Sequence, residues 1–268
     1  MPFADNDGVR LAYERDGVSD GETIVFVCGL GYGTWMWNWQ RERFADEYDL
    51  ILWDNRGAGG SEEPEGPYTI PEMASDLEAV LEDAGVESAH VVGASMGGMI
   101  AQQYVLDYDR AETVSLLCTT PGGPEEEPIP DETLDRMFGV PEGYDQREAI
   151  RYKMKPALTD EFWESNQDVI EQIVEWRVES DASDQAREWQ AAGVDQFDVS
   201  DRLDEIRIPT LVLHGKRDRV VPVGNSDLLV SGIPTATRQT FDEGGSHLFF
   251  VERGDDVSAA IKEFLHDT

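Results

Sequence analysis

Ser95 lies at the centre of Gly93-Ala94-Ser95-Met96-Gly97, a stretch that fits the pattern G-x-S-x-G. In that pattern the chain turns so sharply from a strand into a helix that the serine hydroxyl is exposed at the carboxyl edge of a sheet. The flanking residues agree, because His90 to Val92 is typical of a buried strand and the residues from Met96 onward favour a helix. An ordinary Gly/Ser turn could have the same five residues. The position between strand and helix favours a nucleophilic serine instead.

A serine hydroxyl is a poor nucleophile at neutral pH unless an imidazole takes its proton. The chain has four histidines. His90 begins a predicted strand at the end opposite the serine, His214 lies within another, and His266 lies in the last predicted helix. His247 alone lies in a glycine-rich loop after a late strand. We therefore predict that His247 is the general base.

The imidazole in turn needs a carboxylate on its second ring nitrogen, which holds its tautomer and orientation. Asp218 follows a predicted strand and meets this need. Asp242 and Glu243 are so close to His247 in the chain that they cannot easily approach the back of its ring. The predicted triad is therefore Ser95, Asp218 and His247, in the chain order of strand-turn-helix serine hydrolases.

Strand-like and helix-like segments alternate along most of the chain and would position these groups. A hairpin is expected around Asn6-Asp7-Gly8, and a capping box at Thr69 to Glu72 begins a helix that ends before Gly85. Further strands are predicted at 23–28, 48–54, 113–119, 210–215 and 237–241, and further helices at 160–178, 184–192, 223–233 and 255–266. This alternation predicts a doubly wound, mostly parallel sheet with an N-terminal antiparallel hairpin, which binds ligands beyond the carboxyl ends of its strands.

Residues 121–201 differ from the rest, because an acidic linker rich in proline and glycine leads into helix-like segments without a long β-branched run. We predict one core domain, residues 1–120 and 202–268, with residues 121–201 inserted as a helical cap. Tryptophans are numerous in the cap and near the first glycine-rich loop, where they could pack the core or contact a substrate. The candidates for the substrate pocket are Trp35, Trp37, Trp163, Trp176 and Trp189.

Two glycine-rich loops follow predicted strands. The loop at 29–33 lacks the spacing G-x-G-x-x-G, so a dinucleotide site is disfavoured, and an oxyanion loop explains its glycines better. In the loop at 54–61, Asp54 and Arg56 could be catalytic, but we expect them instead to form an ion pair that holds the loop beside the site.

The formal charge of −35 comes from 56 acidic and 21 basic residues. Such a charge disfavours nucleic acids and anionic membranes as partners. It also destabilises a compact fold in dilute buffer, whereas molar salt screens the repulsion within about 3 Å. Because the lysines are confined to Lys153, Lys155, Lys216 and Lys262 while the apolar segments are ordinary, the chain resembles proteins of salt-accumulating halophiles.

Cys28 and Cys118 each end a predicted strand, and these strands are expected to flank the strand before Ser95. The two cysteines would then lie roughly 9–10 Å apart, too far for a disulfide, so we predict two buried thiols. Neither has the spacing of a metal site. No signal segment and no apolar run of membrane-spanning length is present, which predicts a soluble, cytoplasmic protein.

These motifs together resemble the α/β-hydrolase superfamily: 93–98, 54–61, Asp218 after His214-Gly215, and His247 after Gly244-Gly245-Ser246. The resemblance spans the chain except 121–201, which corresponds to the variable helical cap of that superfamily. It implies the α/β-hydrolase fold and, by position, an oxyanion hole made by the backbone N–H groups of Leu30 and Met96. Many members have His-Gly where this chain has Cys28-Gly29, so a hydrogen bond that braces the loop is expected to be missing.

Residues 66–70 and 95–102 are similar to 3-oxoadipate enol-lactonases and related carboxylesterases. The resemblance implies a serine hydrolase without cofactor or metal that cleaves a small carboxylic ester or lactone through an acyl-enzyme. A carbon–carbon bond hydrolase or a cofactor-free perhydrolase on the same triad is the alternative among enzymes. A ligand-binding protein that has kept the fold without catalysis is the alternative from another class.

Overall fold

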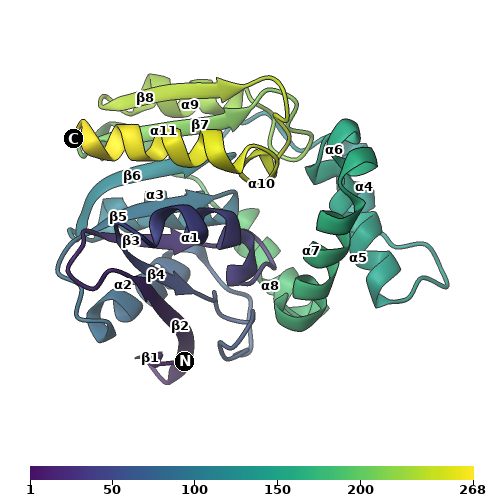
Figure 1. Cartoon of the computed structure of the whole chain (residues 1–268), viewed down its shortest axis with the longest axis horizontal. Helices are drawn as coiled ribbons and strands as arrows, with labels where there is room; N and C mark the ends of the chain where they lie inside the picture. Colours follow the sequence, from purple (N-terminus) through teal and green to yellow (C-terminus); the bar gives the residue numbers. More distant parts are fainter.

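The computed structural model describes all residues from 1 to 268 and contains one sheet of eight strands (Figure 1). The strands follow one another across the sheet in the order β1-β2-β4-β3-β5-β6-β7-β8. Their bounds are β1 (Phe3–Asn6), β2 (Val9–Gly17), β3 (Thr23–Val27), β4 (Asp49–Trp53), β5 (Ala89–Ala94), β6 (Ala111–Leu117), β7 (Thr210–Gly215) and β8 (Ala236–Phe241). The strand that leads to Ser95 is therefore central, with β3 and β6 on its two sides.

The pairing of the strands confirms the predicted sheet. β1 and β2 form the antiparallel hairpin, and β2 also runs antiparallel to β4, while the other neighbours are parallel. The hairpin turns at Asp7 and Gly8, both of which have positive φ, as a tight turn of this kind requires. All parallel strands consequently end at one edge, where the loops after them meet.

Helices cover both faces of the sheet, and each layer encloses its own apolar core. One core contains Phe44 and Ile261, from α1 (Asn38–Phe44) and α11 (Gly254–His266). The other contains Leu77, Ile100 and Leu229 from three helices: α2 (Ile70–Asp83), α3 (Met96–Asp107) and α9 (Asn225–Gly232). The fold is the predicted α/β-hydrolase fold, and the expected capping box at Thr69 begins α2.

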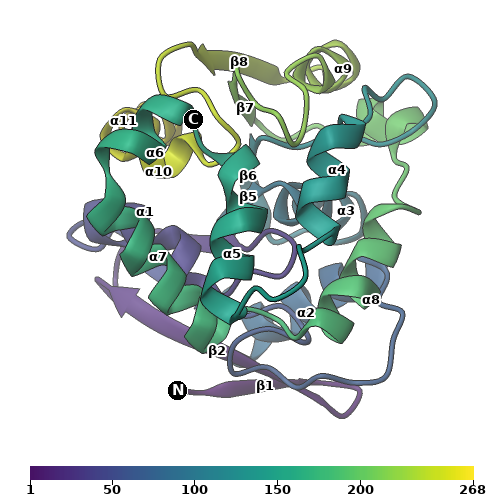
Figure 2. The same ribbon diagram turned by 90° about the vertical axis from the view of Figure 1, so that its right-hand side faces the viewer.

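A group of helices called the cap helices below lies beyond the carboxyl edge of the sheet (Figure 1) and in front of it in Figure 2. These helices are α4 (Asp131–Phe138), α5 (Gln146–Met154), α6 (Asp160–Ser165), α7 (Gln167–Ser180) and α8 (Asp184–Val194). The helix predicted at 160–178 is two helices, because the chain leaves the helical conformation at Asn166. The sequence did not predict α4, α5 or the short α10 (Phe249–Glu252).

Short 3-10 turns connect several elements: η1 (Thr34–Trp37), η2 (Lys155–Ala157) and η3 (Ser200–Glu205). Cys28 follows β3 and Cys118 follows β6, on opposite sides of β5, and both are buried free thiols as predicted. None of the helices has both the length and the apolar character needed to cross a membrane.

Candidate active site

Ser95 joins β5 to α3 in a strained conformation, with φ 57° and ψ −123°. A residue other than glycine rarely has positive φ, so the surrounding structure must hold the turn. Two glycines make it possible. A Cβ at Gly93 would lie 2.2 Å from the carbonyl oxygen of Gly97, and a Cβ at Gly97 would lie 2.2 Å from that of Val27. Close packing of backbone against backbone thus requires both glycines of the motif.

His247 and Asp218 meet although 29 positions separate them. Nδ1 of His247 lies 2.8 Å from Oδ2 of Asp218, and both residues are buried. The other carboxylate oxygen, Oδ1, accepts the backbone N–H groups of Val220 at 2.7 Å and Val221 at 2.9 Å. Because both of its oxygens form hydrogen bonds, the Asp218 carboxylate is held in place behind the His247 ring. Donation to this carboxylate requires the proton on Nδ1, which leaves Nε2 of His247 unprotonated.

The charge of Asp218 is favoured by its neighbours. Burial by itself raises the pKa of this carboxyl, but the rings of His247 and His214 lower it to about 2. His214 is fully buried, and its Nε2 donates to the carbonyl oxygen of Val221 at 2.9 Å and lies 3.4 Å from Oδ2 of Asp218. The sequence predicted that His214 lies within a strand but not that it contacts Asp218.

The remaining histidines lie elsewhere. His90 is buried at the start of β5 and pairs with Thr113 through Nδ1, and His266 lies beside Glu47 at the surface. Asp242, the rival carboxylate in the sequence, forms an ion pair with Lys216. These contacts leave His247 and Asp218 as the imidazole and carboxylate at the edge where Ser95 lies.

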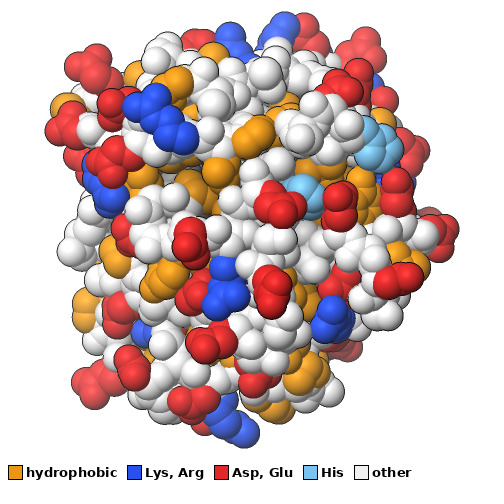
Figure 3. Space-filling model, turned by 90° about the vertical axis from the view of Figure 1, so that its left-hand side faces the viewer, with side chains coloured by type: hydrophobic (Ala, Val, Ile, Leu, Met, Phe, Trp, Pro, Cys, Tyr) orange, Lys and Arg blue, Asp and Glu red, His pale blue; other side chains and the backbone are white.

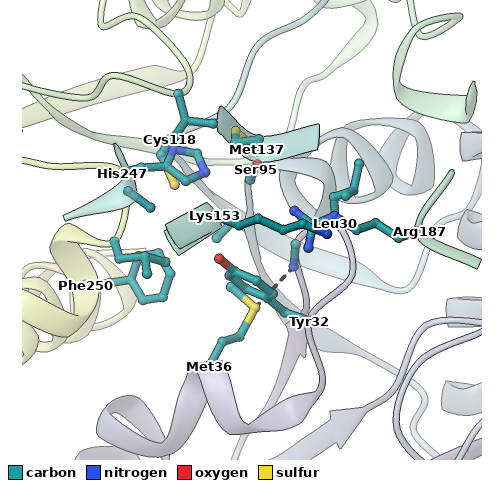
Figure 4. Close-up of a pocket in the computed structure, with 15 residues that line it drawn as sticks. Leu30, Tyr32, Met36, Ser95, Cys118, Met137, Lys153, Arg187, His247 and Phe250 are labelled. Carbon is teal, nitrogen blue, oxygen red and sulfur yellow. Dashed lines mark hydrogen bonds between the residues drawn. The ribbon is translucent and has the colours of Figure 1, made fainter. Parts of the chain in front are cut away.

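A cavity of about 40 Å³ lies at this edge, and Ser95 and His247 both line it (Figure 4). The side-chain hydrogen bond of His247 is to Asp218 and not to Ser95 Oγ. Hydrogen bonds at such sites are often long in a ligand-free structure and tighten when a substrate binds. Side chains from the cap helices, Met137, Lys153 and Arg187, occupy much of the surrounding space. Ligand sites usually enclose about 300–1,000 Å³, so a ligand of ordinary size would fit only if these side chains moved.

Two backbone amide groups are expected to bind an oxyanion, one in the loop after β3 and one at the start of α3. Leu30 lines the cavity, and neither its N–H group nor that of Met96, the first residue of α3, donates a hydrogen bond within the protein. The first N–H groups of a helix have no intrahelical partner and point toward negative charge. Both groups are therefore free to receive a ligand oxygen.

Three side chains brace this loop in place of the histidine that the sequence lacks. Nδ2 of Asn55 donates to the carbonyl oxygen of Cys28 at 2.9 Å, and the N–H of Gly29 lies 3.2 Å from Sδ of Met36. From α8, Oε1 of Gln190 accepts the N–H of Gly31 at 2.7 Å. Asn55 follows β4, whereas Gln190 comes from the cap helices, so the loop is held from both sides.

The expected ion pair between Asp54 and Arg56 is wrong. Arg56 instead forms a bidentate pair with the buried Asp76 of α2, at 2.6 and 2.8 Å. Asp54 accepts the backbone N–H groups of Thr34 and Gly60, both at 3.0 Å. The packing of α2 beneath the loop brings Asp76 to the guanidinium, and proximity in the sequence gave no sign of this.

None of the five tryptophans predicted for the substrate pocket lines the cavity beside Ser95. The physical reason is that each ring packs on another element instead. Trp37 is fully buried against Phe250, and Trp35 stacks on Trp176 while its Nε1 donates to Asp181. Trp163 lies beneath the charged groups of Arg151 and Lys155, and Trp189 packs on Tyr68.

The sequence also missed Glu252, which joins the loop of His247 to the start of cap helix α6. Its carboxylate accepts a hydrogen bond of 2.9 Å from the hydroxyl of Ser246. It also accepts hydrogen bonds from the backbone N–H of Thr159 at 2.6 Å and from the Thr159 hydroxyl at 3.0 Å. Burial raises the pKa of Glu252, and these donors oppose that effect. No local signal marks this residue, because its partners come from distant parts of the chain.

Cys118, Asp218 and His247 present possible metal ligands within 4.8 Å of one another. The hydrogen bond between Asp218 and His247 already uses one atom of each, however. Burial, together with the charge of Asp218, raises the pKa of the Cys118 thiol, which keeps it in the neutral form that binds metals poorly. The donor set fits a hydrogen-bonded triad better than a metal site.

Comparison with known proteins shows the family to which the chain belongs. The family model of the alpha/beta hydrolase fold matches residues 22–253. A putative carbamate hydrolase RutD of Azorhizobium caulinodans is 33% identical over 258 residues, which cover 93% of this chain and 92% of the relative. The 3-oxoadipate enol-lactonase 2 of Acinetobacter baylyi is 27% identical and covers 96% of this chain, with 93% of its own length matched.

Solved structures include the enol-lactonase from Burkholderia xenovorans, which is 26% identical. It superposes with a TM-score of 0.84 and covers 99% of this chain and 100% of its own. The similarity therefore extends over the core and the cap helices alike.

Proposed function

The chain belongs to the α/β-hydrolase family, and we propose that it is a serine hydrolase that cleaves a carboxylic ester or lactone. In this proposal residues 121–201 form a cap over a core of residues 1–120 and 202–268. The substrate is a small molecule, and its carbonyl group lies in the cavity between Ser95 and the loop of Leu30.

The proposed reaction has two halves. Ser95 Oγ attacks the carbonyl carbon while Nε2 of His247 takes its proton, and the N–H groups of Leu30 and Met96 hold the oxyanion. The imidazolium, stabilised by Asp218, then gives its proton to the leaving alcohol, and an acyl-enzyme remains. Water activated by His247 attacks the acyl-enzyme and releases the acid, which restores the serine.

The hydrogen bond of 2.8 Å between His247 and Asp218, beside Ser95 in one cavity, carries this proposal. It supports an activated serine because a base without an orienting partner would hold the wrong tautomer part of the time. The free amides of Leu30 and Met96 support stabilisation of the oxyanion. The choice of an ester or lactone rests on the relatives named as enol-lactonases, and the relative named as a carbamate hydrolase adds carbamates as compounds to test.

Hydrolysis of para-nitrophenyl acetate by the purified protein in concentrated KCl tests the proposal. Ser95→Ala should abolish turnover, whereas Ser231→Ala, an exposed position in α9, should leave it unchanged. Full activity of Ser95→Ala would contradict the mechanism. A wild-type protein that binds a small molecule tightly but turns over no ester, lactone or carbamate would favour a ligand-binding role.

A further inference from the structure

The cavity wall has a charge opposite to that of the chain as a whole. The chain has 56 acidic and 21 basic residues, yet no aspartate or glutamate lines the cavity. Lys153 of α5 and Arg187 of α8 do line it, and Figure 4 shows both side chains crossing the centre of the view between Ser95 and Tyr32. This positive wall needs a physical explanation in so acidic a protein.

Arg187 has no anionic partner. It forms no ion pair and no hydrogen bond, and its Nε is buried without an acceptor. Burial, followed by the positive charge of Arg177, lowers the pKa of Arg187, although a guanidinium stays protonated at neutral pH. Arg187 is partly buried, and a charge withdrawn from water without an anionic partner is costly, so the site is better satisfied when an anion enters.

The carboxylates near Arg187 are already engaged. Asp181 accepts hydrogen bonds from Nε of Arg177 at 2.6 Å and from Nε1 of Trp35 at 2.9 Å. Asp184 is largely exposed and pairs with Lys153 at 3.3 Å. The protein itself therefore supplies no carboxylate to the guanidinium of Arg187.

Arg187 lies next to the oxyanion loop. Its Cγ, Cδ and Nη1 atoms lie 3.4 to 3.5 Å from the position that a Cβ at Gly31 would occupy. Gly31 directly follows Leu30, whose amide is proposed to bind the oxyanion. An anionic group held by Arg187 would thus lie only a few atoms from the carbonyl that Ser95 attacks.

A second hollow, of about 490 Å³, lies among the cap helices and shares Lys153 and Arg187 with the catalytic cavity. It is lined by residues of α5, by Tyr144, and by the segment from Arg177 to Asp184. The two cations therefore stand between this outer hollow and Ser95. Lys153 can exchange the exposed Asp184 for an incoming anion at little cost, because exposed ion pairs are weak.

We propose that the substrate carries a carboxylate a few atoms from its scissile carbonyl, and that Arg187, assisted by Lys153, binds this carboxylate. The inference rests on the proposed function, because it names the class of ester or lactone that the same site would hydrolyse. A planar guanidinium binds a carboxylate through two parallel hydrogen bonds, which would fix the orientation of the substrate as well as its affinity.

Two matched esters test this inference, para-nitrophenyl hemiadipate and its methyl ester, which differ only in the free carboxylate. At constant ionic strength, kcat/KM should be higher for the hemiadipate than for the methyl ester. Arg187→Met keeps an unbranched apolar stem beside Gly31 and should lower the ratio of the two values about 10- to 100-fold, as expected for loss of a charged hydrogen bond. Arg187→Lys should restore part of the ratio, and Arg207→Gln, at an exposed arginine without an ion pair, should leave it unchanged.

A ratio that is below one in the wild type, or that Arg187→Met does not change, would overturn the inference. Calorimetric titration of adipate into Ser95→Ala protein tests the anion site separately from the proposed function, because binding needs no turnover. The anion site can be supported even if neither ester is hydrolysed. In that case the Ser95→Ala protein should bind adipate, and the double variant Ser95→Ala/Arg187→Met should not. Absence of binding to the Ser95→Ala protein would refute it.

Discussion

Gln190 of cap helix α8 accepts a hydrogen bond of 2.7 Å from the backbone N–H of Gly31, in the loop proposed to bind the oxyanion. Its amide nitrogen also donates to the carbonyl oxygen of Arg56 at 2.9 Å. Gln190 is fully buried. One side chain of the cap helices thus joins the two glycine-rich loops that follow β3 and β4.

We expect Gln190→Ala to lower kcat about tenfold, because the Gly31 and Arg56 backbone groups lose their partner at a cost of about 1–3 kcal/mol each. A displaced loop would stabilise the oxyanion less well. Steady-state kinetics and thermal unfolding of the same preparation check this. Gln185→Ala, on the exposed side of α8, is the matched control. A lower melting temperature with unchanged kcat would mean that Gln190 stabilises the fold without positioning the loop.

Replacing Asp218 with asparagine should preserve the size of the side chain but allow the wrong tautomer of His247. We expect kcat for an ester to fall by about 10⁴-fold, with a smaller change in KM. Asp242→Asn should have little effect, because Asp242 pairs with Lys216 at the surface. Similar losses in both variants would contradict the assignment of Asp218.

The low pKa of Asp218 also predicts a pH dependence of stability. Its pKa in the folded state is about 2, below the unfolded value of about 3.9. The ionised carboxylate therefore stabilises the fold above about pH 4, and this contribution is lost as the pH falls toward 2. The contribution is on the order of 2 kcal/mol. Denaturant unfolding should show the stability difference between wild type and Asp218→Asn narrowing from about pH 5 to about pH 3. A constant difference over that range would argue against this linkage.

We propose that the acidic surface is an adaptation to high salt. Acidic side chains are scattered over the face in Figure 3, among fewer basic ones, and the formal charge is −35. Their mutual repulsion is screened in molar salt. The melting temperature should therefore rise steadily from dilute buffer to molar KCl. An unchanged or falling melting temperature over the same series would contradict the proposal.

Local patterns predicted much of the architecture correctly. The turn at Ser95 needs glycine at Gly93 and Gly97, because backbone atoms within the motif and in the adjacent strand lie too close for a Cβ. The capping box at Thr69 and the turn at Asp7-Gly8 are equally local. Such features depend on a few consecutive residues, so the sequence by itself determined the strands, the main core helices and the edge where Ser95, Asp218 and His247 lie.

Tertiary packing decided what surrounds that edge. Arg56 pairs with Asp76 because α2 packs beneath its loop, and the cap helices bring Lys153 and Arg187 to the cavity while the predicted tryptophans pack elsewhere. Gln190 reaches Gly31 across 159 positions of sequence. The direction in which each cap helix faces depends on contacts with every neighbouring element. Residue type and spacing therefore led to the candidate residues Ser95, Asp218 and His247, whereas the packing of the cap helices determined which other side chains line the cavity beside them.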